Sequence, residues 1–589
     1  MDLQASLAMY NSTAAYVPTT HSPHGSGYRT DARVAEFGAD LDDSQRSAVC
    51  LALDAVLGGG DHGGGDVTAQ LINGPPGTGK TRTLVALVRC VEAAGLDALV
   101  VSRTNVAANE VLAALHEHFP SESTISRDAR RVVRIGMAPP DGHPASQAHV
   151  DAVVARCVAA EHPHVQAEYE AASGLVASLT AGPRRHDGYP APPDQHAVAR
   201  AVDAQERLRR AEKALDAATR STRRAVCATA RMLVTTIASS VLSDIGGRGC
   251  SLIICDEAAA VSTPAVVSSV VRAPRRGRGG ADGGRGGDSG RRRGDTDPAD
   301  TTRCVVLVGD PAQLPPSAGP VSYRGATVAM GLSAFERCVS GRRHVCTTLR
   351  HQYRMRPALS RIPYLLFYAR RTGSRHQPHS ARLAALDVPG GHPPWMANIP
   401  AVLVESTSTS ALRHQGRDVG SCSVRNDFEV TLVKRSLVNI IRAWHAAAAP
   451  HDLRVRVVAP YAAQVAALAV AVADVTAEHV TRVRSSVCRL TVKVDTVDAS
   501  QGASDHVLIL SLCRTARAED LGTRRSGIGF VGDHRRMNVG LTRAALHVHV
   551  VGDIDCIVAA SPIWRQWFRA VREEVRGGSS LYAVRDTVR

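Results

Sequence analysis

The chain has 589 residues, and at about 100–200 residues per domain it predicts roughly two to four domains. Its formal net charge of +15 and isoelectric point near 9.5 favour a polyanionic partner, nucleic acid before an acidic membrane. The thirteen cysteines form no Cys-x-x-Cys pair, which argues for reduced thiols in an intracellular protein and against a zinc finger or disulfide framework. Neither a signal peptide nor a membrane span is expected, because residues 1–30 lack an apolar core and the run 455–475 is broken by Pro460 and Gln464.

The N-terminal region is expected to be a flexible tail over residues 1–40. A helix with an Asp or Ser cap is predicted over 41–57, and a glycine-rich loop follows at 58–65.

A phosphate-binding loop is predicted between a β-rich segment at 67–73 and an apolar-periodic helix. The loop reads Gly74-Pro75-Pro76-Gly77-Thr78-Gly79-Lys80-Thr81. Its glycines let backbone N–H groups turn inward, and the helix N-terminus adds positive dipole. Lys80 is expected to reach the β- and γ-phosphates, and the Thr81 hydroxyl to take a Mg²⁺ position. Only four of the 70 basic residues are lysines, and a compact ammonium fits between phosphates where a planar guanidinium does not.

Alternating strands and helices predict two α/β domains, 41–345 and 346–589, each with a parallel sheet covered on both faces. The strand-like runs are 67–73, 98–102, 232–236, 252–255 and 305–308 in the first domain, and 401–404, 454–459, 490–494, 507–512 and 546–551 in the second. A final amphipathic helix over 563–575 is expected to pack through Trp564, Trp567 and Phe568.

Two insertions are predicted in the first domain. Residues 139–224 are rich in Ala, Glu and Arg and indicate a helical insertion that lies on the core domain. Residues 272–300 are rich in Arg and Gly and are expected to be disordered. A nucleic-acid tether and a tolerated surface loop explain this second insertion equally well. The Arg/Gly-rich loop and the tail are also the expected sites for protein partners.

Two carboxylates and an amide follow later strands of the first domain. The apolar strand 252–255 ends in Asp256 and Glu257. Asp256 is expected to hold Mg²⁺, directly or through water, and Glu257 to accept the proton of an attacking water. Gln313 follows the next strand, where its amide can sense a γ-phosphate.

In this order the motifs resemble those of superfamily 1B helicases, in the branch that contains the nonsense-mediated-decay helicase and senataxin. The likeness covers roughly residues 41–575. The matching segments are Gln45, the phosphate loop, Thr104-Asn105-Val106-Ala107, Thr235-Thr236, Asp256-Glu257, the run 309–316, Gln352-Tyr353-Arg354-Met355-Arg356-Pro357, Pro460-Tyr461 with Gln464, Thr496-Val497-Asp498-Ala499-Ser500-Gln501-Gly502, and Arg536-Met537-Asn538-Val539-Gly540-Leu541-Thr542-Arg543.

The resemblance implies two tandem RecA-like P-loop domains that hydrolyse ATP with Mg²⁺ in the cleft between them. It implies that Gln45 and Tyr353 bind the adenine, and that Arg354 and Arg543 act on the γ-phosphate from the second domain. The nucleic-acid contacts it implies are Thr104, Asn105, Thr236, Pro460, Tyr461, Thr496 and Gln501. Closure of the cleft would then drive a monomeric motor along single-stranded DNA or RNA, in the 5′-to-3′ direction.

Two other classes fit parts of the sequence. A hexameric AAA+ ATPase uses the same loop, but it would not carry a second α/β domain with these motifs. An ATP-binding nucleic-acid scaffold with weak turnover is suggested by Ala260, where the family's Asp-Glu-Ala-x-Gln has an amide, and by the Arg/Gly-rich insertion. His547 and His549 alternate on a strand and are interpreted as packed or solvated side chains, not metal ligands. The expected location is the nucleus or cytoplasm, or the host nucleus if the arginine bias reflects a GC-rich viral genome.

Overall fold

The computed structural model describes most of the chain. The described residues are 27–58, 68–118, 132–140, 142–144, 146–180, 195–241, 250–270, 302, 304–317, 321–323, 326–328, 331–340, 345–368, 399–407, 415–417, 423–446, 452–480, 489–515 and 528–586. The Arg/Gly-rich segment 272–300 lies outside them.

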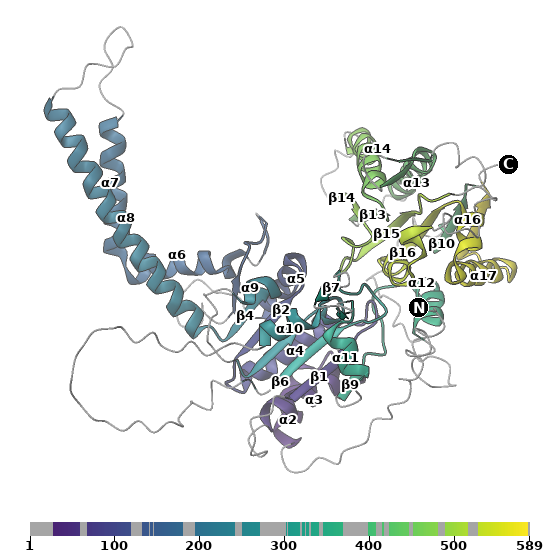
Figure 1. Cartoon of the computed structure of the whole chain (residues 1–589), viewed down its shortest axis with the longest axis horizontal. Coiled ribbons are helices and arrows are strands. Elements are labelled where there is room, and N and C mark those ends of the chain that lie inside the picture. The colour runs from purple at the N-terminus through teal and green to yellow at the C-terminus, as the bar shows by residue number, and fades with distance from the viewer. Residues whose placement is uncertain are drawn as a thin grey trace, which may run out of the picture.

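The first sheet has seven parallel strands in the order β3-β4-β2-β5-β6-β1-β9 (Figure 1). In chain order these are β1 (Thr68–Asn73), β2 (Ala98–Ser102), β3 (Val132–Ile135), β4 (Met232–Thr236), β5 (Leu252–Cys255), β6 (Cys304–Gly309) and β9 (Val345–Thr348). Its strands are almost continuously apolar, as expected for a parallel sheet that is buried on both faces. Because β9 belongs to this sheet, the sequence-derived division at residue 345 falls at the start of its last strand.

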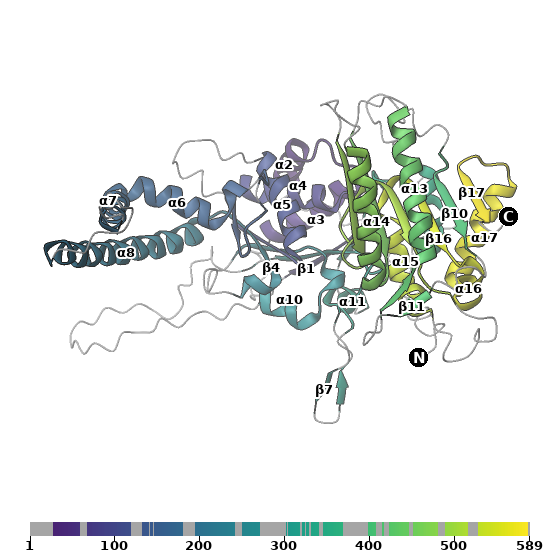
Figure 2. The same cartoon turned by 90° about the horizontal axis from the view of Figure 1, so that it is seen from above.

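Helices cover both faces of the first sheet (Figure 2). Their bounds are α3 (Asp43–Leu57), α4 (Lys80–Ala93), α5 (Asn105–His118), α6 (Val150–Glu161), α9 (Ile237–Ser240), α10 (Thr263–Val270) and α11 (Ala334–Ser340), with short 3-10 turns η2 (Ser146–Ala148) and η3 (Ala258–Ala260). Successive residues of β1 point to opposite faces: Ile72 packs with α3, α4 and α5, whereas Leu71 packs with α6, α10 and α11. The sheet therefore separates two apolar cores.

Helix α2 (Gly27–Phe37) lies inside the segment expected to be a flexible tail, so that expectation is wrong for residues 27–37. Val34 is buried against α3 and α4, and the Arg89 guanidinium lies 4.8 Å from the centroid of the Phe37 ring. The spacing of Val34 and Phe37 puts both side chains on one face of a helix, and burying that face orders the segment. Residues 1–26 lie outside the described part of the chain.

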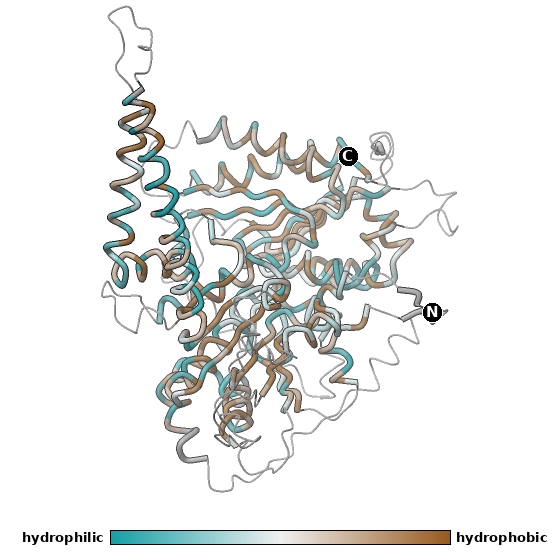
Figure 3. The backbone as a smooth tube through the Cα atoms, turned by 60° about the vertical axis from the view of Figure 1, so that its left-hand side comes forward, coloured by the Kyte–Doolittle hydropathy of each residue, from teal (hydrophilic) through white to brown (hydrophobic). Residues whose placement is uncertain are grey.

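A helical arm leaves the first domain in the region of the predicted insertion (Figures 1 and 2). It is made of α7 (Pro163–Thr180) and α8 (Gln195–Thr229), which lie side by side. The small side chains of Ala172, Ala204 and Ala211 are buried and allow the close approach, while charged side chains cover much of the outside. Figure 3 shows hydrophilic and hydrophobic residues alternating along both helices.

The second domain holds a six-stranded parallel sheet in the order β14-β13-β15-β16-β10-β17. In chain order these are β10 (Val402–Ser406), β13 (Leu453–Ala459), β14 (Leu490–Thr496), β15 (Asp505–Ser511), β16 (Ala544–Gly552) and β17 (Tyr582–Asp586). Among the described residues, two short antiparallel pairs join β7 (Val321–Tyr323) with β8 (Ala326–Val328), and β11 (Gln415–Arg417) with β12 (Val424–Asn426). The fold class, two α/β domains with parallel sheets, is confirmed.

Two helical layers cover this second sheet. Its helices are α12 (Pro357–Phe367), α13 (Asp427–Ala446), α14 (Ala462–Val480), α15 (His534–Leu541), α16 (Ile554–Ala560) and α17 (Pro562–Arg576), with the 3-10 turn η10 (Gly529–Gly532). Leu508 packs with α12, α16 and α17, whereas the next residue, Ile509, packs with α13 and α14.

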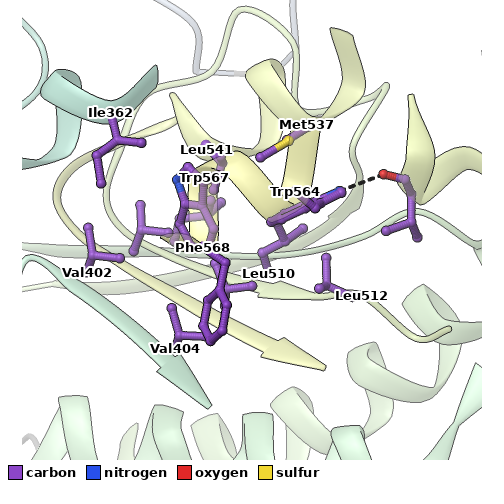
Figure 4. Packing of buried hydrophobic residues seen from close by; sticks show 14 of the residues in the cluster. Ile362, Val402, Val404, Leu510, Leu512, Met537, Leu541, Trp564, Trp567 and Phe568 are labelled. Atoms are coloured by element: carbon purple, nitrogen blue, oxygen red, sulfur yellow. Dashed lines mark hydrogen bonds between the residues drawn. The ribbon is translucent and has the colours of Figure 1, made fainter. Parts of the chain in front are cut away.

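The aromatic side chains of α17 form the centre of one of these layers (Figure 4). Trp564, Trp567 and Phe568 are buried, which confirms the predicted packing role. The two indole rings meet edge to face with centroids 5.4 Å apart, and Trp564 Nε1 donates to Val531 O at 2.8 Å. The helix therefore belongs to the core of the second domain.

Replacing Trp567 with alanine should destabilise the second domain by about 3–5 kcal/mol, because the side chain is 2% exposed and its loss leaves a cavity. We expect the melting temperature to fall by roughly 10 °C in a thermal scan. Gln566→Ala, at an exposed position of the same helix, is the control and should melt close to wild type. Equal melting of the two variants would contradict a core role for Trp567.

Candidate active site

The phosphate loop follows β1 and opens α4, at the carboxyl edge of the first sheet. Gly77 and Gly79 have φ of +74° and +76°, a left-handed conformation that favours glycine. A Cβ on Gly77 would lie 2.6 Å from Arg354 Cβ, and one on Gly79 would lie 2.5 Å from Gln45 Nε2. The loop is therefore packed against a helix of its own domain and against the segment that leads to the second domain.

Lys80 is folded against its own loop. Its Nζ donates to Gly74 O at 2.6 Å and Pro75 O at 3.3 Å. Loss of hydration lowers the pKa of Lys80, although the nearby carboxylates of Asp310 and Asp256 oppose this shift. The described bonds satisfy the ammonium with neutral carbonyl oxygens, which an anionic ligand can replace.

Asp256 and Glu257 leave β5 together and face the same space. Asp256 is buried and its Oδ1 accepts from Glu257 N at 2.9 Å. Glu257 has φ +54°, a strained conformation for a residue with a side chain. Burial raises the pKa of Glu257 to about 7, with a further contribution from the Asp256 charge, and burial also raises the pKa of Asp256. The carboxylates of Asp256 and Glu257 and the hydroxyl of Thr81 line the same pocket and offer the hard oxygen donors that Mg²⁺ prefers, so these residues fit the ion.

Two guanidinium groups reach the same space from the other side. Arg354 Nη1 donates to Thr542 O at 3.1 Å, and Arg543 Nε donates to Val539 O at 2.9 Å. Arg543 Nη2 lies 3.5 Å from Gln313 Oε1, so a side chain of the first domain and one of the second domain meet here. The arrangement concentrates positive charge opposite Asp256 and Glu257.

These groups surround a pocket of about 160 Å³. Its lining residues are Pro76, Gly77, Thr78, Gly79, Lys80, Thr81, Ala107, Glu110, Asp256, Glu257, Ala259, Ala260, Gly309, Asp310, Gln313, Arg354, Gln501, Gly502 and Arg543. The volume is below the roughly 300–1,000 Å³ typical of small-molecule sites, and the lining is that of a phosphate and cation chamber.

Four predicted ligand-binding residues lie outside this lining: Gln45, Gly74, Pro75 and Tyr353. Gln45 is buried, its Oε1 accepts from Asp42 N at 3.1 Å, and its Nε2 donates to Thr78 O at 2.9 Å. Tyr353 donates its hydroxyl proton to Asp42 Oδ2 at 2.7 Å. The structure therefore places Gln45 between the cap of α3 and the phosphate loop.

Sequence reasoning missed two carboxylates of the pocket, Glu110 and Asp310. Asp310 stands three residues before Gln313 in the motif already noted, so its position was a usable signal. Glu110 lies on α5, and nothing in its local sequence distinguishes it from a solvated helix residue. Partial loss of hydration raises the pKa of Glu110, and the Asp256 charge adds to the shift.

The predicted nucleic-acid residues of the first domain lie at the carboxyl ends of β2 and β4. Thr104 Oγ1 accepts from Ala107 N at 3.2 Å at the start of α5, and Thr236 Oγ1 accepts from Ser239 N at 3.2 Å. Asn105 Oδ1 accepts from the buried Arg134 at 2.9 Å. The adjacent positions of β3, β4 and β2 in the sheet bring these groups to one edge.

The corresponding residues of the second domain lie at the carboxyl ends of β13 and β14. Pro460 and Tyr461 follow β13, and Thr496 ends β14, where its Oγ1 accepts from Ala499 N at 3.2 Å. Gln501 is separate from this group, because it lines the pocket and accepts from Arg103 Nη1 at 3.4 Å.

Exposed apolar side chains accompany these polar groups and were not predicted. Val106 and Met137 are each 66% exposed, and Val241 is 59% exposed. They follow β2, β3 and β4, the three neighbouring strands of that edge. On the second domain, Phe530 is 52% exposed and its ring centroid lies 5.8 Å from that of Tyr461.

Other site types find no support in the described part of the chain. There, no group of three or more His, Cys, Asp or Glu residues is placed to hold a metal ion. No described helix combines the length and apolar character needed to cross a membrane. His547 and His549 are buried, with His547 Nδ1 2.5 Å from Pro400 O and His549 Nδ1 2.6 Å from Ser436 Oγ.

Comparisons with known proteins place these features in a family. Two family models, each described as an AAA domain, match residues 40–276 and 330–555. DNA-binding protein SMUBP-2 of Mesocricetus auratus is 24% identical over 543 residues, which are 91% of this chain and 44% of that protein. ATP-dependent helicase NAM7 of Saccharomyces cerevisiae is 29% identical over 46% of this chain and 25% of its own length. For 5'-3' DNA helicase ZGRF1 of Mus musculus the identity is 29% over 43% of this chain and 11% of that protein. The chain spans less than half the length of each of these relatives.

Replacing Gly77 with alanine should weaken binding of a Mg²⁺–nucleoside triphosphate by roughly tenfold or more. The new Cβ would collide with Arg354 Cβ and its backbone, so the loop and the interdomain segment must shift apart. A labelled nucleotide titration measures the effect. Gly95→Ala is the matched control, because Gly95 has a similar φ of +77° but open space around it. Equal losses in both variants would show that backbone strain alone is responsible.

Proposed function

We infer that the chain is an ATP-dependent helicase or translocase of single-stranded DNA or RNA, because it belongs to the superfamily 1B helicases, in the branch of the nonsense-mediated-decay helicase and senataxin. One observation carries this proposal: a single pocket between two RecA-like domains joins Lys80, Asp256 and Glu257 of the first domain to Arg354 and Arg543. Such a pocket is complete only when the domains are together.

Each residue has a proposed role in hydrolysis. Lys80 exchanges the carbonyl oxygens of Gly74 and Pro75 for the β- and γ-phosphates. Thr81 and Asp256 would hold Mg²⁺, which when bound supplies charge neutralisation at the phosphates. Glu257 accepts the proton of the attacking water.

Gln313 and the two arginines would act at the γ-phosphate. Arg354 and Arg543 stabilise the charge that develops during transfer, and an arginine in this role is typically worth about 10³–10⁵ in kcat. Gln313, beside Arg543, senses the γ-phosphate. Gln45 and Tyr353 are proposed to bind the adenine, which requires them to exchange their bonds to Thr78 and Asp42.

The nucleic acid is proposed to lie across the carboxyl edges of both sheets. Hydroxyl and amide groups of Thr104, Asn105 and Thr236 would hold phosphates on the first domain, and Pro460, Tyr461 and Thr496 would act on the second. Val106, Met137 and Val241 offer apolar surface to sugars and to the faces of bases, and only a single strand exposes those faces. The positive net charge of the whole chain favours this partner.

Cleft closure would then convert hydrolysis into movement along one strand. The family implies the 5′-to-3′ direction, and the name of the similar ZGRF1 gives the same polarity for that protein. We propose that the chain acts as a monomer inside the cell, with protein partners bound through the tail or the Arg/Gly-rich insertion.

A scaffold that binds ATP but turns it over weakly is the second candidate. Ala260 lines the pocket and has no polar side-chain atom to bring to it. An amide there would help to couple the γ-phosphate to movement.

Steady-state ATP hydrolysis, measured with and without single-stranded DNA or RNA, tests the proposal. We expect one polymer to stimulate turnover, and Lys80→Ala to abolish it because the phosphates lose their ammonium. Glu257→Gln should retain nucleotide binding but lose turnover, which separates binding from chemistry. Binding of nucleotide and strand by the wild type without turnover would favour the scaffold.

The pH profile should report Glu257. Its folded pKa is raised to about 7, and a general base must be deprotonated, so kcat/KM for ATP should increase as the pH rises through about 7 and then level off. In the Asp256→Asn variant, removal of that neighbouring charge should shift the rise to lower pH. A profile that is flat from pH 5.5 to 8.5 in the wild type would contradict this role.

A further inference from the structure

Tyr368, which follows α12, joins the two domains through its hydroxyl group. The hydroxyl donates to Asp310 Oδ2 at 2.7 Å, in the loop after β6 of the first domain. It also accepts from Asn538 Nδ2 at 2.6 Å, on α15 of the second domain. Tyr368 is buried and does not line the pocket, so it does not contact a ligand bound there.

On the first domain this contact fixes the loop that carries Gln313. Asp310 Oδ2 also accepts from Gln313 Nε2 at 2.8 Å, and Asp310 Oδ1 accepts from Ala312 N at 2.9 Å. Asn538 Nδ2 adds a bond to Ala312 O at 3.0 Å. The orientation of the Gln313 amide is therefore determined by groups that Tyr368 and Asn538 hold in place.

On the second domain the same contact extends to Arg543. Thr542 Oγ1 donates to Asn538 O at 2.7 Å, and Arg543 Nη2 donates to Thr542 Oγ1 at 3.0 Å. The same nitrogen lies 3.5 Å from Gln313 Oε1. These contacts close a ring of six residues across the interface, all of them buried: Tyr368, Asp310, Gln313, Arg543, Thr542 and Asn538.

The ring can form only when both domains are in place. The groups that make these hydrogen bonds are buried, and separating the domains would remove several of the partners shown here, which is costly for a buried polar group. Because the Tyr368 hydroxyl serves both as donor and as acceptor, its loss would break the ring on both sides at once.

We propose that Tyr368 is a positioning residue that couples Gln313 to Arg543. The Gln313 amide, which senses the γ-phosphate, and the Arg543 guanidinium, which stabilises its charge, would then take up their positions together. This inference rests on the proposed ATP hydrolysis. It assigns no contact between Tyr368 and the nucleotide, and its effect is therefore expected in kcat rather than in the binding of ATP.

The variant Tyr368→Phe removes only the hydroxyl group and keeps the aromatic side chain in its apolar surroundings. We expect kcat for ATP to fall about tenfold or more, with KM within about twofold of wild type, because Arg543 is left less well placed. Asn538→Ala should give a similar loss, and the double variant should lose little more, because both changes break the same ring.

Tyr582→Phe is the matched control. Tyr582 is also buried in this core, and its hydroxyl donates to Ala358 O at 2.6 Å, outside the ring. It should match Tyr368→Phe in melting temperature but keep the kcat of wild type. If Tyr368→Phe kept the wild-type kcat, or if both phenylalanine variants lost it equally, the coupling role would be overturned.

Binding of ADP with aluminium fluoride, compared with ADP alone, gives a second measurement that does not require turnover. The wild type should bind the fluoride complex more tightly, because it mimics the transferring phosphoryl group, and Tyr368→Phe should lose about tenfold of this preference without losing affinity for ADP. If the wild type hydrolysed no ATP but still preferred the fluoride complex, and Tyr368→Phe lost that preference, the proposed turnover would be refuted and the coupling role of Tyr368 would stand. An unchanged preference in the variant would refute the coupling itself.

Discussion

Burial of opposite charges in one cleft is the constraint on which the site depends. Asp256 and Arg543 are both buried, and a charge that is taken out of water is stable only beside compensating groups. Asp256 is compensated within the first domain, by the Glu257 N–H and the Lys80 charge. Arg543 bonds to Val539 O and Thr542 Oγ1 of the second domain and meets Gln313 of the first. The described bonds of Lys80 go to backbone carbonyl oxygens. An anionic ligand can therefore replace these neutral oxygens and bind the Lys80 ammonium.

The domains also touch around the pocket, and these contacts, like the pocket, depend on how the two domains are placed relative to each other. Arg535 donates to Glu336 Oε1 at 2.6 Å, and both side chains are largely removed from solvent. Breaking such a pair leaves a buried charge without compensation, which costs far more than losing an exposed pair. A change in the angle between the domains would alter this ion pair, the Tyr368 ring and the pocket together.

The sequence predicts those parts of the site whose geometry is local. The phosphate loop is set by a strand, glycines with left-handed φ and the following helix, all within residues 68–93, so Lys80 and Thr81 could be identified directly. Asp256 and Glu257 were accessible because a buried strand ends at them. The contacts of Tyr368 and Asn538 were not accessible, because each residue reaches Asp310 or its neighbours only after folding, across sequence separations of 58 and 226 residues. Helix α2 was missed for a related reason: its short apolar face is stable only against α3 and α4.

The pocket and the proposed nucleic-acid edge meet in the segment that follows β2, where Ala107 lines the pocket and its N–H bonds to Thr104 Oγ1. A second connection is Arg103. This residue follows β2 and directly precedes Thr104, so it belongs to the same short segment as the predicted phosphate contact. Its guanidinium donates to Gln501 of the second domain, and its charge favours the ionised form of Glu257, which lowers the pKa of that carboxyl against the effect of burial. Thr104, at the edge of the first sheet, is therefore the direct neighbour in sequence of Arg103, whose charge acts on Glu257 in the pocket. Coupling between the proposed nucleic-acid site and the pocket needs no long path through the core. A nucleic acid that displaced Thr104 would displace Arg103 with it.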